Sequence, residues 1–530
     1  MSTVRDETFA VMRRFGMTRI FGNPGSTEIP FLADFPADLE FVLGLHEGAV
    51  VGMASGYALG TGRPAFVNLH TAAGLGNAVN AIVCARDNRI PLVIVVGQQD
   101  RRQLSLAPFL TGRNLDRLAG DYPVWTSQPA HPSEVPGAIA RAWHEASVRR
   151  GPALVVVPMG DWEEQIGKEW AGPAAPARLL TAAAVDPTAL GELVDFVSAA
   201  TAPALVVGAG VDSPEGWAGT VALAEQLSCP VWQDTFSSRA GFPQDHPLFA
   251  GHLPWRRHEL RRLFAGTDLV VAIGTPAFRL YLYDDGPLVE PGTRVAVIGD
   301  DPEDVLRSRC ELALLAPPAA VCSALATRIA RRTGRVEPFP RPPAPKAPAP
   351  GEPLRPVHVL AALAERLPRD AILVEEAPSN RPEMLARIPI REPLGFVAVA
   401  NGALGFGLAG SIGLRMAMPS RPVVALLGDG SSSYSMQALW SAAHYGVGVV
   451  FVVMGNGGYA VMDQLAHLHG APGAWPSFES LNLATVAAGL GCNSVRVSTY
   501  PELTRILDDA MSGLVRRREP LLIDVRVEPS

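Results

Sequence analysis

Short apolar runs alternate with longer stretches of helical period along most of the chain. In the first third, the runs are rich in Val, Ile and Leu, with few polar interruptions. Such runs are typical of strands buried on both faces of a parallel sheet, with helices in the crossovers. The pattern therefore predicts βαβ units, with strands at TRIFG (18–22), FVLGLH (41–46), PAFVNLHT (64–71), PLVIVVGQQ (91–99) and PALVVVPM (152–159).

The same alternation returns twice further along the chain. One set of runs comprises PALVVGAG (203–210), PVWQDT (230–235), DLVVAIGTP (268–276) and RVAVIGDD (294–301). The other comprises AILVEE (371–376), PVVALLGDG (422–430), VVFVVMGN (449–456) and PLLIDVRV (520–527). The expected fold class is therefore α/β, with three doubly wound parallel-sheet domains at 1–180, 181–335 and 357–530.

A proline-rich segment separates the second and third sets. In VEPFPRPPAPKAPAPGEPLRP (336–356), nine of the last nineteen residues are proline. Proline lacks a backbone N–H and fixes φ, so this segment cannot be helical or pair as a central strand. We expect a semi-extended interdomain linker.

Composition and charge remove several function classes. The 530 residues are 48% hydrophobic and 18% charged, which fits a globular chain and argues against wholesale disorder. The net charge of −7 provides no basic field for nucleic acid or for an anionic membrane, so neither is an expected partner. Any anionic ligand must be held by local groups.

The cysteines and the N-terminus predict a cytoplasmic location. The five cysteines are scattered without a CxxC pair, which fits a reducing compartment and gives no thiolate metal site. MSTVRDETFAVMRRFGM (1–17) alternates charged with apolar residues and lacks the apolar core of a signal peptide. No window reaches the roughly 18 uncharged apolar residues of a membrane span.

Two polar turns follow strands of the third domain. PVVALLGDG ends at Gly428-Asp429-Gly430, and VVFVVMGN ends at Asn456, 27 residues after Asp429. Glycines let backbone N–H groups approach an anion at a helix N-terminus, and a carboxylate there can hold a hard cation. If the strands are adjacent, Asp429, the Asn456 amide oxygen and a carbonyl near Gly458 would surround Mg²⁺ bridging two phosphates. Two unrelated turns are the alternative.

At these residues the chain resembles the thiamin-diphosphate enzymes, whose metal-diphosphate signature is GDG, an apolar stretch of this length and then Asn. The resemblance implies thiamin diphosphate and a divalent metal, Mg²⁺ or Ca²⁺, in the third domain. It implies that Asp429, Asn456 and Gly458 bind the metal. The implied cofactor-binding residues of this region are Gly428, Asp429, Gly430, Ser431, Ser432, Asn456, Gly458 and Tyr459.

A second motif lies near the start of the chain. In LHEGAVVGMASGYALG (45–60), Glu47 begins a helix that is otherwise made mainly of small and apolar residues. A buried carboxylate there is costly unless it is hydrogen-bonded. A solvated carboxylate at the positive end of the helix dipole is the simpler alternative. The resemblance implies that Glu47 is the family's glutamate that contacts the aminopyrimidine ring of the cofactor.

The resemblance covers nearly the whole chain, in the order pyrimidine-binding, central and diphosphate-binding domain. Among the 2-oxo acid decarboxylases of the family, the chain most resembles the benzoylformate decarboxylases, at IFGNPGSTEIPFL (20–32), NLHTAAGLGNA (68–78) and FRLYLYDDG (278–286). NGALGFGLAGSIG (401–413) resembles the loop whose apolar residue, here Leu404, props the cofactor in its bent form. The further cofactor-binding residues that the resemblance implies are Asn23, Pro24, Asn77, Pro378, Ser379, Gly402 and Leu404.

The same segments imply the residues that act on the substrate. Taken alone, Ser26 could be a helix N-cap and His70 an ordinary core histidine. The resemblance instead implies a serine and a histidine in the substrate pocket. The implied catalytic residues are Glu47, His70, Ser26 and Tyr281, and the implied pocket residues are Ser26, His70, Leu110, Arg381, Ala398, Met462 and Leu465.

Several positions depart from the benzoylformate decarboxylases. Tyr281 stands where those enzymes have a second active-site histidine, and a phenol with a pKa of about 10 is a poor proton shuttle at neutral pH. Ala398 and Leu465 match aromatic pocket positions, and Pro378 and Arg381 replace small hydroxyl residues. We therefore expect a wider pocket with a different rim charge, whose substrate need not be benzoylformate.

The sequence predicts a thiamin-diphosphate-dependent carboxy-lyase that converts an aromatic or bulky 2-oxo acid to an aldehyde and CO₂. One alternative, favoured by Tyr281, is a carboligase or lyase of the same family that makes or breaks a C–C bond, with an aldehyde as acceptor. A second alternative is a non-catalytic relative. The family arrangement implies at least a homodimer, and we expect a homotetramer.

Overall fold

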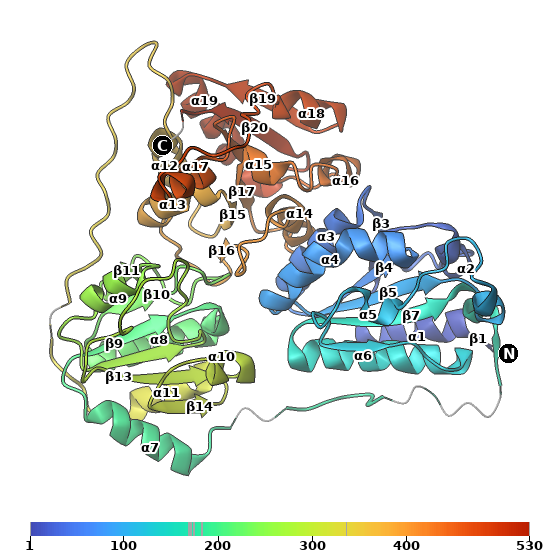
Figure 1. The fold of residues 1–530 in the computed structure, drawn as a ribbon, viewed down its shortest axis with the longest axis horizontal. Helices are drawn as coiled ribbons and strands as arrows, with labels where there is room; N and C mark the ends of the chain where they lie inside the picture. Colours follow the sequence, from blue (N-terminus) through green and yellow to red (C-terminus); the bar gives the residue numbers. More distant parts are fainter. Residues whose placement is uncertain (1, 168–171, 173–174, 182–183, 335, 529–530) are drawn as a thin grey trace.

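The computed structural model describes residues 2–167, 172, 175–181, 184–334 and 336–528. The described residues form three six-stranded sheets, each in its own α/β unit along the chain (Figure 1). Every strand pair within these three sheets is parallel. The predicted fold class, three doubly wound parallel-sheet domains, is therefore confirmed.

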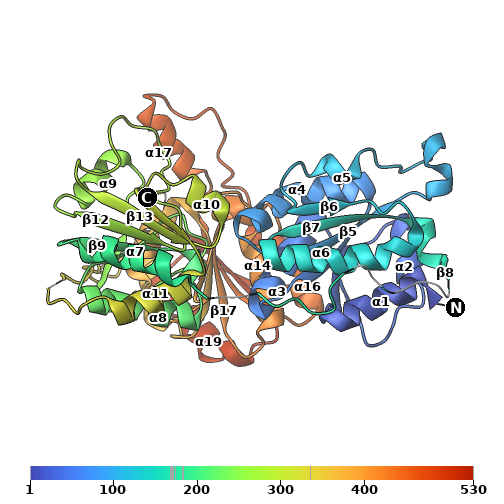
Figure 2. The same cartoon turned by 90° about the horizontal axis from the view of Figure 1, so that it is seen from below.

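The first unit has the strand order β3-β2-β4-β5-β7-β6 and is covered by helices on both faces (Figures 1 and 2). Neighbouring strand residues face opposite cores: Phe66 packs in one apolar cluster and Val67 in another. The strands are β2 (Arg19–Asn23), β3 (Glu40–Leu43), β4 (Ala65–Leu69), β5 (Leu92–Gln98), β6 (Trp125–Ser127) and β7 (Pro152–Pro158). The main helices are α1 (Val4–Phe15), α3 (Glu47–Thr61), α4 (Thr71–Asp87) and α6 (Val135–Arg149).

The central unit has the strand order β11-β10-β9-β12-β13-β14. Its strands are β9 (Pro203–Val207), β10 (Val231–Gln233), β11 (Phe249–His252), β12 (Leu269–Ile273), β13 (Arg294–Gly299) and β14 (Leu312–Leu315). Its helices include α7 (Pro187–Ser198), α8 (Pro214–Leu227), α10 (Pro302–Leu306) and α11 (Pro318–Arg328).

The third unit has the strand order β16-β15-β17-β18-β20-β19. Its strands are β15 (Ile372–Glu376), β16 (Phe396–Val397), β17 (Val423–Gly428), β18 (Val450–Gly455), β19 (Asn493–Val497) and β20 (Leu521–Arg526). Its helices include α12 (Pro356–Arg366), α13 (Arg381–Arg387), α14 (Gly407–Ala417), α15 (Asp429–Ser432), α16 (Ala438–His444), α17 (Ala460–Leu468), α18 (Leu483–Gly489) and α19 (Tyr500–Ser512).

The sequence pattern missed five of the six edge strands of these sheets; only β3 was predicted. The apolar runs did not indicate β6, β11, β14, β16 or β19, and each of these lies at an edge of its sheet. Edge strands are covered by fewer neighbours, so their side chains need not form continuous apolar runs. In β19, for example, Asn493 and Arg496 are exposed. The pattern therefore identifies the middle of each sheet better than its edges.

The first and third units are joined by a close helix crossing. Helix α3 packs against α14, and one apolar core continues from one unit into the other. A Cβ atom on Gly56 would lie 1.9 Å from the carbonyl oxygen of Gly410, and one on Gly413 would lie 1.8 Å from that of Met53. Glycine is therefore required where the two backbones touch.

The proline-rich segment runs along the outside of the molecule (Figure 1). Described residues 336–355 form neither helix nor strand, and α12 begins at Pro356. The predicted domain boundaries stay predictions, and their end residues 1, 335 and 530 lie outside the described residues. Among the described residues, no helix has the length and apolarity needed to cross a membrane.

Candidate active site

The two polar turns of the third unit lie side by side. Strands β17 and β18 pair in parallel, with Gly428 opposite Met454, so their carboxyl ends meet at one sheet edge. The Asp429 carboxylate accepts hydrogen bonds from Gly457 N (2.7 Å) and Gly430 N (2.8 Å). The Asn456 Oδ1 atom accepts one from Gly458 N (3.1 Å). A carboxylate and an amide oxygen thus stand on neighbouring turns, as a hard-cation site requires.

Hydroxyl groups hold the glycine turn in shape. The Ser431 Oγ donates to the carbonyl of Glu376 (2.5 Å) and accepts from Gly428 N (3.0 Å). The Ser432 Oγ donates to the carbonyl of Gly428 (2.7 Å). Because these hydroxyls are satisfied by the backbone, both serines serve to shape the turn in the structure as it stands.

A nearby cation would stabilise the ionised form of the buried Asp429 carboxylate. Burial raises its pKa above the ordinary value, the N–H groups of Gly457 and Gly430 lower it, and nearby Asp524 raises it further. Its ionised form is therefore disfavoured without a counter-charge. Among the described residues, no three His, Cys, Asp or Glu side chains cluster as metal ligands. The residues fit Mg²⁺, which is commonly held by one or two carboxylates together with phosphate oxygens.

A cavity of about 1210 Å³ opens over these turns. Its walls come from the central and third units. Gly402 and Gly458 face open space, since a Cβ atom on either would meet nothing within 4 Å. The predicted site residues that line it are Tyr281, Pro378, Ser379, Arg381, Gly402, Leu404, Gly428, Asp429, Gly430, Ser431, Asn456, Gly458, Tyr459, Met462 and Leu465. The cavity has room for a large organic diphosphate and a substrate beside it.

Tyr281 forms part of an aromatic wall of this cavity. Its ring stacks on Trp255, with centroids 5.8 Å apart and planes 21° apart, and lies 6.4 Å from the ring of Phe236. The side chain is half exposed and its hydroxyl has no hydrogen-bond partner among the described residues. Tyr281 can therefore offer its hydroxyl to a molecule in the cavity.

Arg381 brings less charge to the cavity than its residue type suggests. Its guanidinium pairs with Glu375 (3.0 Å) and donates to the carbonyl of Thr235 (3.0 Å). It also lies over the ring of Phe396. Glu375 is buried and balances the cation, so the change of rim charge expected from the sequence is neutralised locally.

Glu47 lies in the first unit, at the start of α3. Its side chain is 7% exposed, and its two oxygens accept from Asn23 Nδ2 and Asn77 Nδ2, both at 3.0 Å. Asn23 ends β2 and Asn77 lies on α4, so two elements aim the carboxylate. Glu47 is therefore a positioned, buried carboxylate and not a solvated helix-start residue.

His70 is held by the carboxylate of Glu28, which is not among the predicted site residues. Its Nδ1 lies 2.9 Å from both Glu28 Oε2 and Thr27 Oγ1, and the Thr27 hydroxyl gives its proton to Glu28 Oε1 (2.5 Å). The Nδ1 atom is therefore the donor to Glu28, which leaves Nε2 to exchange a proton with a substrate. A Cβ atom on Gly25 would lie 2.4 Å from Nδ1, so glycine makes room for the ring.

Glu28 had no distinct signal in the sequence. It follows Gly25 by three residues, a spacing typical of a capping box, and it does accept from Gly25 N (2.8 Å). Only the fold shows that its 1% exposed carboxylate also meets His70, 42 residues away.

We expect Glu28→Gln to lower kcat roughly 10²-fold, because the amide cannot fix His70 in the same protonation and orientation. Steady-state kinetics on a 2-oxo acid substrate measure the effect. Glu502→Gln is a matched control, since Glu502 also accepts from a threonine hydroxyl and a backbone N–H but has no histidine partner. Equal kcat in both variants would show that Glu28 only caps its turn.

The two halves of the predicted site do not meet within one chain. None of the described residues of the first unit lines the cavity. The predicted residues outside it are Ser26, Asn23, Pro24, Glu47, His70, Asn77 and Leu110 from the first unit, and Ala398 and Ser432 from the third. Ala398 is fully buried, and its neighbour Val399 lines the cavity instead. The roles assigned to all of these residues stay predictions.

Three models of one protein family match the chain in order. The model described as thiamine pyrophosphate enzyme, N-terminal TPP binding domain, matches residues 2–117. The central-domain model matches residues 190–325, and the C-terminal TPP binding domain model matches residues 382–525.

Curated and solved relatives match over the full length. The benzoylformate decarboxylase of Pseudomonas aeruginosa is 37% identical, with 99% of each chain covered. The solved 4-hydroxybenzoylformate decarboxylase of Rhodococcus jostii RHA1 has a TM-score of 0.94 and 34% identity, with 100% of each chain covered. The solved benzoylformate decarboxylase of Polynucleobacter necessarius has the same TM-score and identity, with 100% of this chain and 99% of that one covered.

Proposed function

The chain belongs to the thiamine pyrophosphate enzymes, and on that premise we propose that it decarboxylates an aromatic or bulky 2-oxo acid to an aldehyde and CO₂. Membership implies thiamin diphosphate and a divalent metal, typically Mg²⁺, as cofactors. The observation that carries the proposal is the pair of adjacent turns bearing Asp429 and Asn456 beneath one large cavity.

The walls of the cavity support the substrate class. Trp255 and Tyr281 form an aromatic face, while Met462 and Leu465 add apolar surface. Arg381 is already paired with Glu375, so its guanidinium would attract a second negative charge on the substrate only weakly. A 2-oxo acid with one carboxylate and a flat apolar body fits this combination best.

Bound thiamin diphosphate supplies the electron sink that loss of CO₂ from a 2-oxo acid requires. In the proposed mechanism, Asp429 and Asn456 would hold the metal beside the diphosphate, and Glu47 would be the acid-base group at the aminopyrimidine end of the cofactor. His70, with Nδ1 held by Glu28, delivers or removes a proton at the substrate oxygen through Nε2. The Ser26 hydroxyl orients the substrate carboxylate.

A screen of 2-oxo acids tests the proposal. Purified full-length protein, loaded with thiamin diphosphate and Mg²⁺, is assayed for CO₂ release from benzoylformate, 4-hydroxybenzoylformate and bulky aliphatic 2-oxo acids. Aldehydes are supplied in parallel as acceptors. We expect CO₂ and free aldehyde with the aromatic acids. Cofactor binding with no turnover of any 2-oxo acid would instead support a non-catalytic relative.

The carboligase alternative rests on Tyr281. A phenol in the cavity wall, in place of the histidine of benzoylformate decarboxylases, would deliver the final proton slowly and give an aldehyde time to add. Decarboxylation and ligation are branches of one pathway, so the same chain could favour either. Product ratios separate them.

We expect Tyr281→His to raise the ratio of released aldehyde to ligated product several-fold, with little change in the affinity for thiamin diphosphate. An imidazole titrates near neutral pH and can protonate the intermediate before a second aldehyde adds. Both products are measured at fixed aldehyde concentration. Tyr283→His is the control, since Tyr283 is 82% exposed and pairs with Asp285. An unchanged or lowered ratio in Tyr281→His would remove Tyr281 from the mechanism.

We also propose that each active site combines two chains, in at least a homodimer and as a pair of dimers. The residues implied for the aminopyrimidine end lie outside the cavity of their own chain. In the same unit, α4 exposes a face of small residues, and the segment after β5 exposes Leu106 (81%) and Phe109 (87%). A second copy that covers these groups would bring its Glu47 to the open side of this chain's cavity. The cytoplasmic location stays a prediction from the sequence.

Hybrid sites test this assembly. We expect a 1:1 mixture of inactive Glu47→Gln and Asp429→Ala chains to recover about a quarter of the wild-type activity after subunit exchange, because half of the dimers then contain one intact site. Exchange is verified with two different affinity tags. No recovery after verified exchange would place each site within a single chain.

A further inference from the structure

The segment that carries Leu404 is irregular, so its backbone N–H and C=O groups need hydrogen-bond partners outside regular secondary structure. Strand β16 ends at Val397 and α14 begins at Gly407, so residues 398–406 lie between them without forming helix or strand among the described residues. Residues 399–404 line the cavity with one side of this loop. Gly402 and Gly405 have φ values of +74° and +107°, so the loop follows a path that few sequences adopt unaided. Its shape must be imposed by bonds from outside.

Asn88, directly after α4, supplies a matched pair of such bonds. Its Nδ2 donates to the carbonyl of Ala398 (2.8 Å), and its Oδ1 accepts from Ala400 N (2.9 Å). One side chain therefore satisfies two backbone groups of the loop, in the way that a neighbouring strand would. Asn88 is 2% exposed, so water does not compete for these bonds.

A second asparagine on α4 holds the other end of the same segment. Asn80 Nδ2 donates to the carbonyl of Leu404 (2.8 Å). From the third unit, Glu376 accepts from Gly405 N (2.7 Å) and Gly407 N (2.6 Å). Burial raises the pKa of Glu376 to about 7, while these N–H groups lower it. Leu404 thus sits between anchors from the first unit and anchors from the third.

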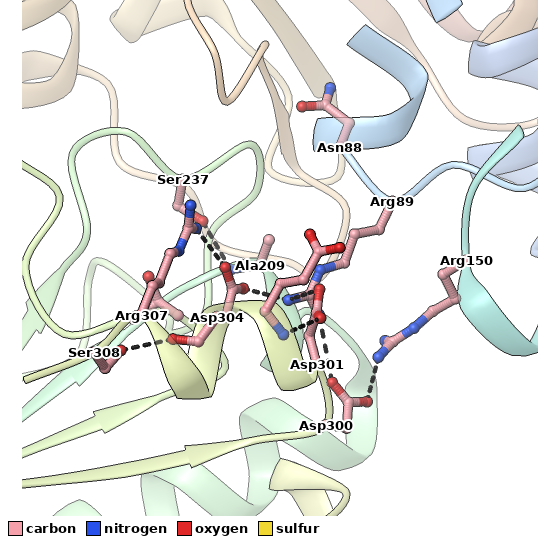
Figure 3. Close-up of polar contacts among 12 residues, drawn as sticks. Asn88, Arg89, Arg150, Ala209, Ser237, Asp300, Asp301, Asp304, Arg307 and Ser308 are labelled. Atoms are coloured by element: carbon pink, nitrogen blue, oxygen red, sulfur yellow. Dashed lines mark hydrogen bonds and ion pairs between the residues drawn. The ribbon is translucent and has the colours of Figure 1, made fainter. Parts of the chain in front are cut away.

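Asn88 does not perform the usual task of a residue at a helix end. Its side chain leaves the carbonyls of α4 alone and reaches a loop 310 residues away. The next residue, Arg89, points elsewhere: it pairs with Asp301 (2.6 Å), Asp304 and Asp300 on the central unit (Figure 3). Figure 3 shows Asn88 directed away from this acidic cluster. Two adjacent residues therefore bind two different units.

We propose that Asn88 and Asn80 are positioning residues for the reaction: they set the path of the 398–404 loop and thereby the place of Leu404 at the cavity. Arg89 instead pairs with the acidic cluster of the central unit and makes no bond to the loop. The inference rests on the proposed function, because Leu404 matters only if a cofactor binds beside it. An error of about 1 Å in such a support can cost on the order of 10²-fold in rate.

Asn88→Asp is the sharpest test. The aspartate keeps the shape and the acceptor for Ala400 N, but it places a carboxylate oxygen against the carbonyl of Ala398. We expect kcat at saturating thiamin diphosphate to fall roughly 10- to 10²-fold, KM for the 2-oxo acid to change much less, and half-saturation by the cofactor to need several-fold more of it. Arg89→Gln is the matched control: we expect kcat within twofold of wild type and a lower midpoint of thermal unfolding.

Amide hydrogen exchange separates this inference from the proposed function. In the cofactor-free full-length protein, we expect Asn88→Asp to speed exchange at 399–406, and Arg89→Gln to leave these amides unchanged. This readout needs no substrate. If the wild type has no decarboxylase activity while the loop still loosens in Asn88→Asp, the proposed function fails and the positioning role stands.

Two results would overturn the inference. One is wild-type kcat and wild-type exchange of the loop in Asn88→Asp. The other is a loss of kcat in Arg89→Gln as large as in Asn88→Asp, which would trace both effects to general destabilisation. If Asn88→Asp does not fold, Asn80→Ala takes its place. Asn80 is exposed, and its loss should lower kcat about threefold to tenfold and speed exchange nearest Leu404.

Discussion

Asp429→Ala should reduce turnover roughly 10²- to 10³-fold, even with excess thiamin diphosphate and Mg²⁺, the range expected for losing one fixed electrostatic group. Asp429 is the only carboxylate among the predicted metal ligands. Burial raises its pKa, so its ionised form needs a cation beside it. Without Asp429, the only charged side chain that would hold the metal beside the diphosphate is lost. Turnover and the concentration of Mg²⁺ needed for half-maximal activity measure the effect.

Asp429 also accepts two backbone N–H groups, so its loss could simply disturb the turn. Asp429→Asn separates the two roles, because the amide oxygen can still accept while the charge is gone. Asp186→Asn is the control. Asp186 accepts from Thr188 N and Ala189 N at the start of α7, and it does not line the cavity. We expect Asp429→Asn to lose activity and Asp186→Asn to keep it. Full activity of Asp429→Ala after treatment with a chelator would remove the metal site from the third unit.

Glu47→Gln should lower kcat by roughly 10²-fold or more while the fold is kept, the scale of a positioned acid-base group. The amide retains the size of the carboxylate and can still accept a hydrogen bond from Asn23 or Asn77. It cannot exchange the proton. Single-turnover and steady-state rates on the same substrate measure the loss.

Glu215→Gln is the matched control for Glu47→Gln, since Glu215 is an acidic residue in the first turn of α8, away from the cavity. We expect it to behave as wild type. Unchanged kcat in Glu47→Gln, with the cofactor bound as tightly as before, would reduce Glu47 to a structural carboxylate that orders Asn23 and Asn77.

The sequence was most informative where chemistry follows directly from a strand. Asp429 and Asn456 each follow an apolar run, and neighbouring parallel strands must bring such residues to one edge. The need for a partner to Glu47 was also visible, since a carboxylate at the start of an apolar helix cannot stay unpaired. In both cases the neighbouring residues in the sequence are enough to explain why the side chain has its place or needs a partner.

Contacts between distant segments could not be predicted in the same way. Glu28 resembles a local cap until β4 places His70 beside it, and Asn88 resembles an ordinary helix end until Ala398 is found next to it. Nothing within a few residues of either one indicates its partner. The expectation of a rim charge at Arg381 missed Glu375 for a related reason: both residues were visible, but not their pairing.

The glycine crossing of α3 and α14 limits how this molecule can move. Gly56 meets Gly410 and Gly413 meets Met53 with no side chains between the two backbones. The helices therefore cannot slide or hinge there without separating main-chain atoms that are already in contact. We therefore expect little relative motion between the first unit and the third at this crossing. Substrate entry must therefore depend on elements outside the crossing. One such element is α17, whose Met462 and Leu465 line the cavity and whose only buried residue is Ala460.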